Sequence, residues 1–540
     1  MYMTYVSGQI SLLMDGKPWT NLSADEDSEG FRPTWLVRTS DMQRVPGTDA
    51  VDGYCTLSYS WNYSGDLVQG EDGEYECVDN GHHQLIYKPS EGASFFEHEI
   101  QHVKFEQLVQ QLCKDFEINY IWYDKMCIDQ NDKVAKHSEI ERMHQIYRSG
   151  KFAVAMIPEM SVPEGVKEVS WTSGILNLRH VINDEKFKER NTIENCLHAI
   201  CDSQWYKRMW TLEEAIMSRQ IVFVGRNAHL WLSTRIFFGG MALSAHMGTI
   251  EDLFELFLTE PPTANMVLRH AHTRNTAKEH DRAYALANIF ADLIEVEVNY
   301  DLPILHVLSC FYSNLLEKDL SILCFGKPRS DYNNTICDYY DLPSWTGISG
   351  IHIRNKAYTL VENPSDIVTV DRTTDPAKHR LNIINCNYLP VTPRQFPLTK
   401  EELSRYMNDG GFKFTHYIDE LSSDKPEHEE MRRGMMAREI APGSDHPLSF
   451  LSLTEEDESD CSECIILDIP FKSTDSRSTR IFPVVRLQQD ASGADGDTKE
   501  TPTYRSIGVL YLRCRKYYFQ KHASLSDFTD QTQNGSFVIV

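Results

Sequence analysis

Short runs of apolar residues in the first half of the chain have the length and composition of buried β-strands. They cover residues 54–61 (YCTLSYSW), 120–123 (YIWY), 152–157 (FAVAMI) and 220–225 (QIVFVG). A nearly continuous apolar run is typical of a parallel strand covered on both faces, whereas a half-solvated strand alternates apolar and polar positions. We therefore expect these runs to form the core of a parallel sheet.

Between these runs, apolar residues recur at the spacing of amphipathic helices. The residues that share one helical face before the second run are Phe105, Leu108, Val109, Leu112 and Phe116. The corresponding residues after it are Ile140, Met143, Ile146 and Tyr147. Residues 192–201 and 209–217 are also predicted helices, residues 33–38 a strand, and the Gly- and Asp-rich residues 65–81 a loop. A strand, helix, strand, helix, strand order indicates a right-handed parallel α/β unit.

The pattern divides the chain into four predicted regions. Residues 1–50 are expected to lead into an α/β domain at 51–225, followed by a mainly helical region at 226–345 and a β-rich region at 346–540. Predicted strands of the last region are residues 382–384, 464–467, 482–485 and 507–512. Residues 422–431 and 488–503 are polar and are expected to be loops or linkers.

Composition narrows the class of protein. A chain of 540 residues with a formal charge of -26 and no long Lys/Arg-rich face is not expected to bind nucleic acid. Its 13 cysteines lack a disulfide spacing framework and indicate reduced thiols. The first residues have no basic leader before an apolar core, and no apolar run approaches the roughly 20 residues of a membrane helix. We expect a cytoplasmic protein outside the membrane.

Polar residues crowd the carboxyl end of the second apolar run, where functional groups collect in open α/β sheets. They are Asp124, Cys127, Asp129, Gln130 and Asp132. The carboxylates and the Gln130 amide can hold a cation or a ribose hydroxyl, or Asp129 or Asp132 simply caps the next helix. Cys127 is either a nucleophile, which needs a nearby base, or a packed thiol.

Glu214 is the preferred catalytic candidate. It lies four residues after Trp210 on the same predicted helical face, with Arg208 just upstream, so that an aromatic wall and a cation neighbour one carboxylate. Such a carboxylate suits glycosidic or N-glycosidic cleavage, in which an oxocarbenium-like transition state develops positive charge. The alternative is a helix glutamate held in a salt bridge.

Two metal-type patterns compete with this interpretation. Residues 98–102 read His-Glu-Ile-Gln-His, the H-E-x-x-H pattern of zinc proteases, if a helix extends over them. The apolar pattern instead starts the helix near Lys104, and no third ligand has a recognisable spacing. Cys461 and Cys464 form a lone C-x-x-C, which is weak support for a metal. We therefore predict no metal, and the zinc protease remains a less favoured alternative.

Three ordered motifs resemble those of the fungal heterokaryon incompatibility (HET) domain. Residues 54–61 are similar to its opening Leu-Ser-Tyr-x-Trp motif, residues 119–147 to its central motif, and residues 208–214 (RMWTLEE) to its Arg-x-Trp-Thr-x-Gln-Glu motif. Residues 281–287 and 342–345 are similar to later family segments, so that the resemblance covers about residues 50–345. This sequence departs from the family pattern in having Glu213 in place of the usual Gln.

The resemblance implies a parallel-sheet domain distantly related to Toll/interleukin-1 receptor (TIR) domains, some of which cleave NAD. It implies an effector of fungal non-self recognition that triggers programmed cell death, acting as an NAD nucleosidase without a required cofactor. Glu214 and Asp124 would be catalytic, and NAD would contact Tyr59, Trp61, Cys127, Asp129, Gln130, Arg208 and Trp210. The alternative is a non-catalytic module that signals by self-association or through a partner protein.

Overall fold

The computed structural model divides into two compact units. The first comprises residues 1–261, 274–291 and 297–299, and the second residues 262–273, 292–296 and 300–540. The described residues are 1–14, 31–70, 75–87, 99–129, 132–163, 169–171, 192, 195–233, 262–328, 342–348, 350–353, 356–361, 363–373, 375, 378–391, 415–416, 448–453, 464–473, 479–488, 502–513, 524–525 and 532–540. The four regions expected from the sequence are not tested by this division into two units and stay a prediction.

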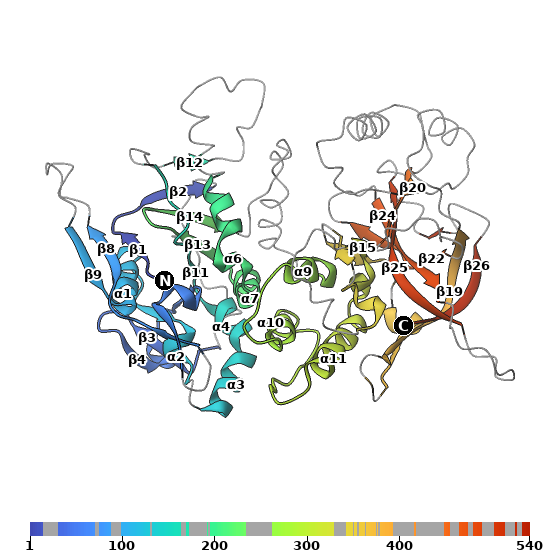
Figure 1. The fold of residues 1–540 in the computed structure, drawn as a ribbon, viewed down its shortest axis with the longest axis horizontal. Coiled ribbons are helices and arrows are strands. Elements are labelled where there is room, and N and C mark those ends of the chain that lie inside the picture. Colours follow the sequence, from blue (N-terminus) through green and yellow to red (C-terminus); the bar gives the residue numbers. More distant parts are fainter. Residues whose placement is uncertain are drawn as a thin grey trace, which may run out of the picture. The chain divides into compact units, whose positions relative to one another are not determined.

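A nine-stranded sheet is the centre of the first unit (Figure 1). Its order is β12 (Val169–Trp171), β2 (Ile10–Met14), β14 (Ala228–Ser233), β13 (Gln220–Val224), β11 (Ala153–Met156), β5 (Cys55–Ser58), β10 (Tyr120–Trp122), β3 (Trp35–Arg38) and β4 (Gln43–Pro46). The four strands β10, β5, β11 and β13 are parallel, as predicted. The sheet as a whole is mixed and not purely parallel as expected, because β3, β4 and β14 join by antiparallel pairing, whereas β12 and β14 both pair with β2 in parallel.

The predicted apolar faces form the core of this unit. All four residues of β5 and all four of β11 are buried, which is the reason for their continuous apolar sequence. Helix α1 (Phe105–Asp115) begins after Lys104, as predicted, and buries its apolar face. The single helix expected around residue 140 is two helices, α3 (Lys133–Glu141) and α4 (Met143–Ser149), which meet at Arg142.

The first 81 residues contain more strands than the sequence predicted. Residues 1–50 are more than a lead-in, because β2, β3 and β4 belong to the main sheet, and β1 (Thr4–Val6) pairs with β8 (His83–Tyr87) in a three-stranded sheet completed by β9 (Glu99–Val103). Residues 65–81 contain an antiparallel pair, β6 (Asp66–Gln69) and β7 (Tyr75–Val78), where a loop was predicted. The Gly- and Asp-rich residues around β6 and β7 conceal this pair in the sequence, whereas β3 lies within the strand predicted at residues 33–38.

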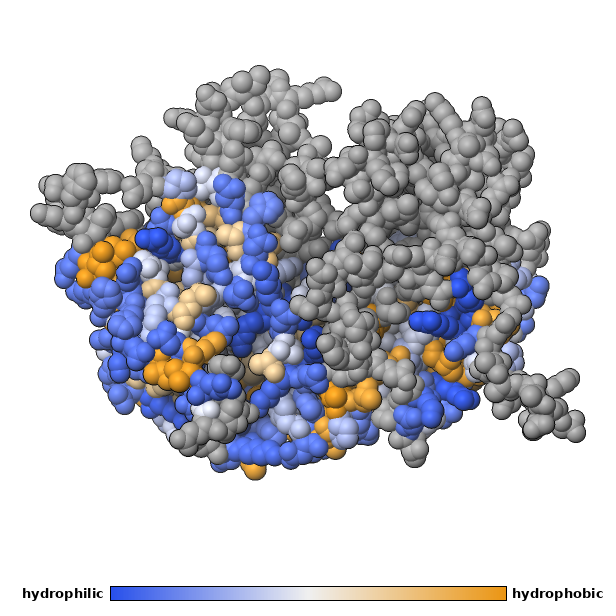
Figure 2. Space-filling view, viewed as in Figure 1, coloured by the Kyte–Doolittle hydropathy of each residue, from blue (hydrophilic) through white to orange (hydrophobic). Residues whose placement is uncertain are grey.

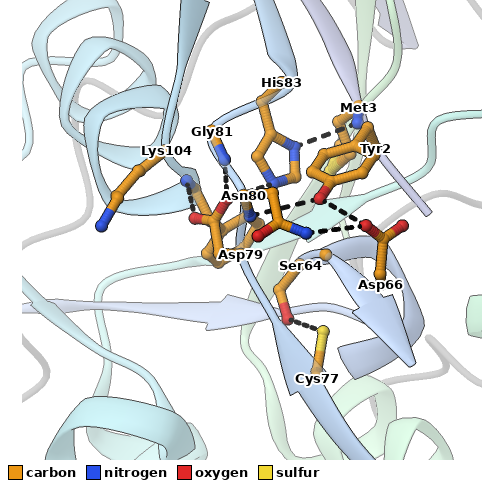
Figure 3. A network of polar contacts seen from close by, with 12 residues as sticks. Tyr2, Met3, Ser64, Asp66, Cys77, Asp79, Asn80, Gly81, His83 and Lys104 are labelled. Atoms are coloured by element: carbon orange, nitrogen blue, oxygen red, sulfur yellow. Dashed lines mark hydrogen bonds and ion pairs between the residues drawn. The ribbon is translucent and has the colours of Figure 1, made fainter. Parts of the chain in front are cut away.

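A polar network around His83 fastens the start of the chain to α1 (Figure 3). The Met3 backbone N–H donates to His83 Nδ1 at 3.1 Å, and one Asp79 oxygen lies 3.7 Å from Nε2. The other Asp79 oxygen accepts from the Phe105 backbone N–H at 2.6 Å. Burial lowers the pKa of His83 and favours the neutral ring. The Phe105 ring stacks on Tyr59 with centroids 5.1 Å apart, which links this network to the end of β5.

Three helices stand beside the carboxyl ends of the central strands. They are α6 (Gln204–Lys207), α7 (Trp210–Met217) and α10 (Asp281–Ile289). Residues 195–202 are also helical, as predicted. The α7 helix packs against α4, α6 and α10, so that nearly all its residues are buried. The polar residues that α7 carries are therefore held in fixed surroundings.

The second unit combines helices with a closed sheet. Its helices include α9 (Ala264–Ala271), α11 (Ile304–Leu316) and the short α12 (Pro364–Ile367), and β15 (Phe325–Pro328) pairs with β16 (Gly350–His352). Five strands close on themselves because β24 pairs with both β22 and β25: β24 (Thr479–Leu487), β22 (Cys464–Leu467), β19 (Arg380–Val391), β26 (Gln533–Ile539) and β25 (Thr503–Arg513). The remaining strands of this sheet are β17 (Ala357–Thr359), β18 (Val368–Asp371), β20 (Thr415–His416), β21 (Leu448–Leu453) and β23 (Phe471–Ser473).

This arrangement confirms the β-rich region expected from the sequence, and each of its four predicted strands lies within β19, β22, β24 or β25. The expected polar loops, residues 422–431 and most of 488–503, lie outside the described residues. The described surface in Figure 2 is mostly hydrophilic, with small separate hydrophobic areas. Scattered apolar surface of this kind is ordinary for a folded protein.

Candidate active site

Ser58, the last residue of β5, is hydrogen-bonded to Glu214 of α7. The Ser58 Oγ donates to Glu214 Oε2. The Ser58 Oγ also accepts a hydrogen bond from the Trp205 indole N–H at 2.5 Å. All three side chains are buried. A hydroxyl that accepts from a donor-only indole has its own proton left for the carboxylate, so that Trp205 orients Ser58 and Ser58 holds one Glu214 oxygen.

The Glu214 carboxyl has the proton affinity of a group that works near neutral pH. Its pKa is raised from 4.5 to about 7, chiefly by burial and to a smaller extent by the nearby Asp124 charge. The Ser58 hydrogen bond, the Arg208 charge and the Tyr147 hydroxyl act in the opposite direction. A carboxyl with this pKa exists in both protonation states near pH 7, which is the property expected of a catalytic acid or base.

Asp124 lies at the end of β10, as the first residue of α2 (Asp124–Cys127). Its Oδ2 accepts the Trp61 indole N–H at 2.6 Å, and its Oδ1 accepts the Lys125 backbone N–H at 2.7 Å. Burial raises the Asp124 pKa, against the opposing effects of Trp61 and Arg208. The buried Tyr59 hydroxyl lies next to Asp124, and burial followed by the Asp124 charge raises its pKa. The Asp124 carboxyl therefore lies next to the side chains of both Tyr59 and Trp61.

Arg208 connects the two carboxyls electrostatically. Its Nη1 donates to the Tyr59 carbonyl at 2.9 Å, and its positive charge lowers the pKa values of both Asp124 and Glu214. Among the described residues, neither carboxyl forms an ion pair within 4.0 Å. Hydrogen bonds and the charge of Arg208 thus hold the buried Glu214 and the half-buried Asp124. This arrangement differs from the salt-bridged helix glutamate that the sequence left as an alternative.

Comparison with known proteins agrees with the three motifs. Residues 54–214 match the family model described as Heterokaryon incompatibility protein (HET). This chain contains a HET domain. The matched residues begin just before β5 and end at Glu214, so that they span all the side chains of the site described above. The search of curated proteins gave no match, and the search of solved structures gave none.

The remaining predicted site residues of the HET domain differ in their surroundings. Trp210 is half-buried at the start of α7, Asp129 is exposed after α2, and Gln130 lies outside the described residues. Cys127 is buried, and burial raises its thiol pKa to about 12, which makes it a packed thiol. Asp132 accepts from the Val134 and Ala135 backbone N–H groups and caps α3, as its alternative interpretation expected.

Glu213, the departure from the HET pattern, points away from Glu214. It is fully buried and accepts from Asn288 Nδ2 of α10 at 3.1 Å, while the same amide nitrogen donates to the Ile140 carbonyl at 2.7 Å. Burial raises its pKa well above 4.5 and favours the neutral acid. A neutral glutamic acid has the shape of glutamine, so that Glu213 takes the structural place of the usual Gln.

The H-E-x-x-H pattern does not have the geometry of a zinc site. Glu99 to Val103 form strand β9, so that the helical i, i+4 arrangement required for two ligands is missing, and His98 lies outside the described residues. Cys461 is likewise outside them. No group of three or more metal-type ligands occurs among the described residues, and none of the described helices is long and apolar enough to cross a membrane.

Several side chains of the site were missed by sequence reasoning. They are Ser58, Trp205, Tyr147 and, beyond the matched residues, Arg274. Ser58 and Tyr147 lie inside motifs that were noticed, and the signal that was available is their position at the end of a strand and on the apolar face of a helix. Trp205 and Arg274 act through contacts over 147 and 66 residues of sequence, and spacing alone does not predict such contacts.

Proposed function

We propose that this protein is an effector of HET-type non-self recognition that triggers programmed cell death by cleaving NAD. The observation that carries the proposal is the Glu214 carboxyl, which is buried, free of an ion pair among the described residues and held by Ser58 with a pKa of about 7. In keeping with the family resemblance, we place the protein in the cytoplasm of a fungus and regard the fold as distantly TIR-like.

The reaction is hydrolysis of the bond between nicotinamide and ribose. That bond breaks with its electron pair passing to the nicotinamide ring, which leaves neutral, and the ribose carbon becomes an oxocarbenium ion. The ionised Glu214 stabilises this cation, and water then adds to the same carbon and loses a proton. Asp124 is suited to accept a hydrogen bond from a ribose hydroxyl, and the cation Arg208 and the half-buried Trp210 belong to the same segment.

The test is release of nicotinamide from NAD by the purified full chain, measured by chromatography at low and high protein concentration. We expect Glu214→Gln to lose about 100-fold or more of the turnover, the scale of a lost acid–base or charge-stabilising group. Glu213→Gln is the matched control, because it replaces the adjacent buried carboxyl and is expected to keep near wild-type turnover. No nicotinamide release at any concentration, or equal turnover by Glu214→Gln, would defeat the proposal.

One observation favours the alternative, a non-catalytic module that signals by self-association. Glu214 is only 8% exposed, so that substrate must displace neighbouring side chains to reach it. On this alternative, Glu214→Gln leaves toxicity on overexpression intact, whereas Ile146→Asp, which introduces a charge at a fully buried position of α4, abolishes it. Loss of toxicity in a folded Glu214→Gln protein would count against the module and for the enzyme.

A further inference from the structure

Arg274 lies 60 residues beyond the end of the HET match and is nevertheless buried against the site, with 2% of its surface exposed. Its Nη1 donates to the Arg208 carbonyl at 2.8 Å and to Thr211 Oγ1 at 2.9 Å. These two acceptors flank the start of α7, the helix that carries Glu214. One guanidinium nitrogen therefore fixes the turn from which this helix begins.

The neighbouring backbone holds the same turn from residue 275. Asn275 N donates to the Lys207 carbonyl at 2.6 Å, and Met209 N donates to the Asn275 carbonyl at 3.0 Å, which together form a parallel bridge. The turn joins α6, whose Trp205 contacts Ser58, to α7. Arg208 lies in this turn and reaches the Tyr59 carbonyl. Residues 274–275 thus help to position three parts of the site: Trp205 on α6, Arg208 in the turn and Glu214 on α7.

The Arg274 side chain is held without a direct ion pair in the part of the chain that the structure describes. Among the described residues it forms no ion pair, and its buried Nε and Nη2 have no hydrogen-bond acceptor. Its guanidinium lies 4.6 Å from the centroid of the Tyr206 ring, a cation–π distance. Its pKa is lowered to about 10, chiefly by burial, while the Tyr206 hydroxyl and then the Glu214 carboxyl act in the opposite direction. A buried charge of this kind acts strongly on a nearby carboxyl.

We propose that Arg274 is a positioning residue of the site: it fixes the α6–α7 turn and, through its buried positive charge, keeps the Glu214 carboxylate ionised. The catalytic importance of Arg274 rests on the proposed function, but its effect on the ionisation of Glu214 does not, because that effect is measurable without turnover. It extends the functional unit beyond residues 54–214 into a segment that the family match does not include.

The experiment follows the Glu214 proton by infrared titration of the full chain. The carboxylic acid absorption that is present in wild type and lost in Glu214→Gln belongs to Glu214, and its pH midpoint is then measured in Arg274→Met and Arg274→Lys. We expect Arg274→Met to raise the midpoint by about one pH unit, a tenfold gain in proton affinity. Arg274→Lys, which keeps the charge, is expected to shift it less. Arg38→Met, at an exposed arginine paired with Asp41, is the control and is expected to leave it unchanged.

An unchanged midpoint in folded Arg274→Met, or equal shifts in Arg274→Met and Arg274→Lys, would overturn the proposal. Should Arg274→Met fail to fold, Thr211→Val replaces it, because this change removes an acceptor of Arg274 and keeps every charge in the chain. A smaller upward shift is expected there, and an unchanged midpoint would also overturn the proposal. Absence of NAD cleavage together with the expected midpoints would reject the proposed function and leave the role of Arg274 standing.

Discussion

Replacing Glu214 by Gln should change how the stability of the protein depends on pH. The wild-type carboxyl has a pKa of about 7 in the folded chain, against 4.5 ordinarily. Between these values the folded chain keeps a proton that the unfolded chain has lost, so that rising pH favours unfolding. The free energy of unfolding therefore falls as pH rises from about 4.5 to about 7 and is level with respect to this group on either side.

The size of this effect follows from the two pKa values. The interval from 4.5 to about 7, at about 1.4 kcal/mol per pH unit, corresponds to about 3 kcal/mol of stability that the ionised carboxyl costs the folded chain. Glutamine has no proton to lose and can still accept the Ser58 hydrogen bond. Glu214→Gln should therefore gain stability relative to wild type as the pH rises, by about 2 to 3 kcal/mol between about pH 5 and about pH 8.

The measurement is urea unfolding followed by circular dichroism at both pH values, for wild type, Glu214→Gln and Glu213→Gln. The difference between wild type and Glu214→Gln isolates this group from every other titrating residue. Glu213→Gln shows whether the second buried acid contributes in the same way, since its pKa is also raised. Parallel pH profiles for wild type and Glu214→Gln would refute the reasoning, because they would mean that Glu214 titrates alike in the folded and unfolded chain.

Three further predictions follow from single contacts. Ser58→Ala removes a hydrogen bond to the charged form of Glu214 and should raise its pKa by about 1 to 2 units, seen in the same infrared titration; a lowered or unchanged value would contradict the assigned donor. Asp132→Ala removes the α3 cap and should cost about 1 kcal/mol in urea unfolding; an unchanged stability would contradict the cap. Gly225→Ala should lower the melting temperature, because its added carbon would lie 2.2 Å from the Met160 carbonyl oxygen; an unchanged value would mean that the backbone yields freely.

The central strands could be predicted because each is a continuous apolar run whose burial requires that sequence. The runs around Leu57, Ile121 and Val154 are fully or almost fully buried in adjacent parallel strands. The strands at the edges of the sheet were harder to predict. β4 is mostly exposed and reads QRVP, so that nothing in its apolar pattern distinguishes it from a loop.

In the site, too, residues that belong to a local motif could be predicted, whereas residues that act through contacts between distant parts of the chain could not. Asp124, Arg208 and Glu214 could be singled out from the sequence because each lies within a recognisable motif. Trp205 was not found, because its role depends on a bond to Ser58 that only the folded chain creates. The direction of Glu213 also needed coordinates, since adjacent helix positions point about 100° apart and sequence does not say which faces the strand ends.

The way in which the chain returns to its first unit bears on how such proteins evolve. After residue 261 the chain contributes α9 to the second unit, then comes back with Arg274, Asn275 and α10 before leaving again. An exchange between two such genes with one junction after Glu214 would take β13, α10 and the segment that holds the α6–α7 turn from a different parent than the site residues before the junction. We therefore expect recombinant chimaeras to match the folding stability of their parents only when the junction falls after residue 299, so that the whole first unit comes from one parent.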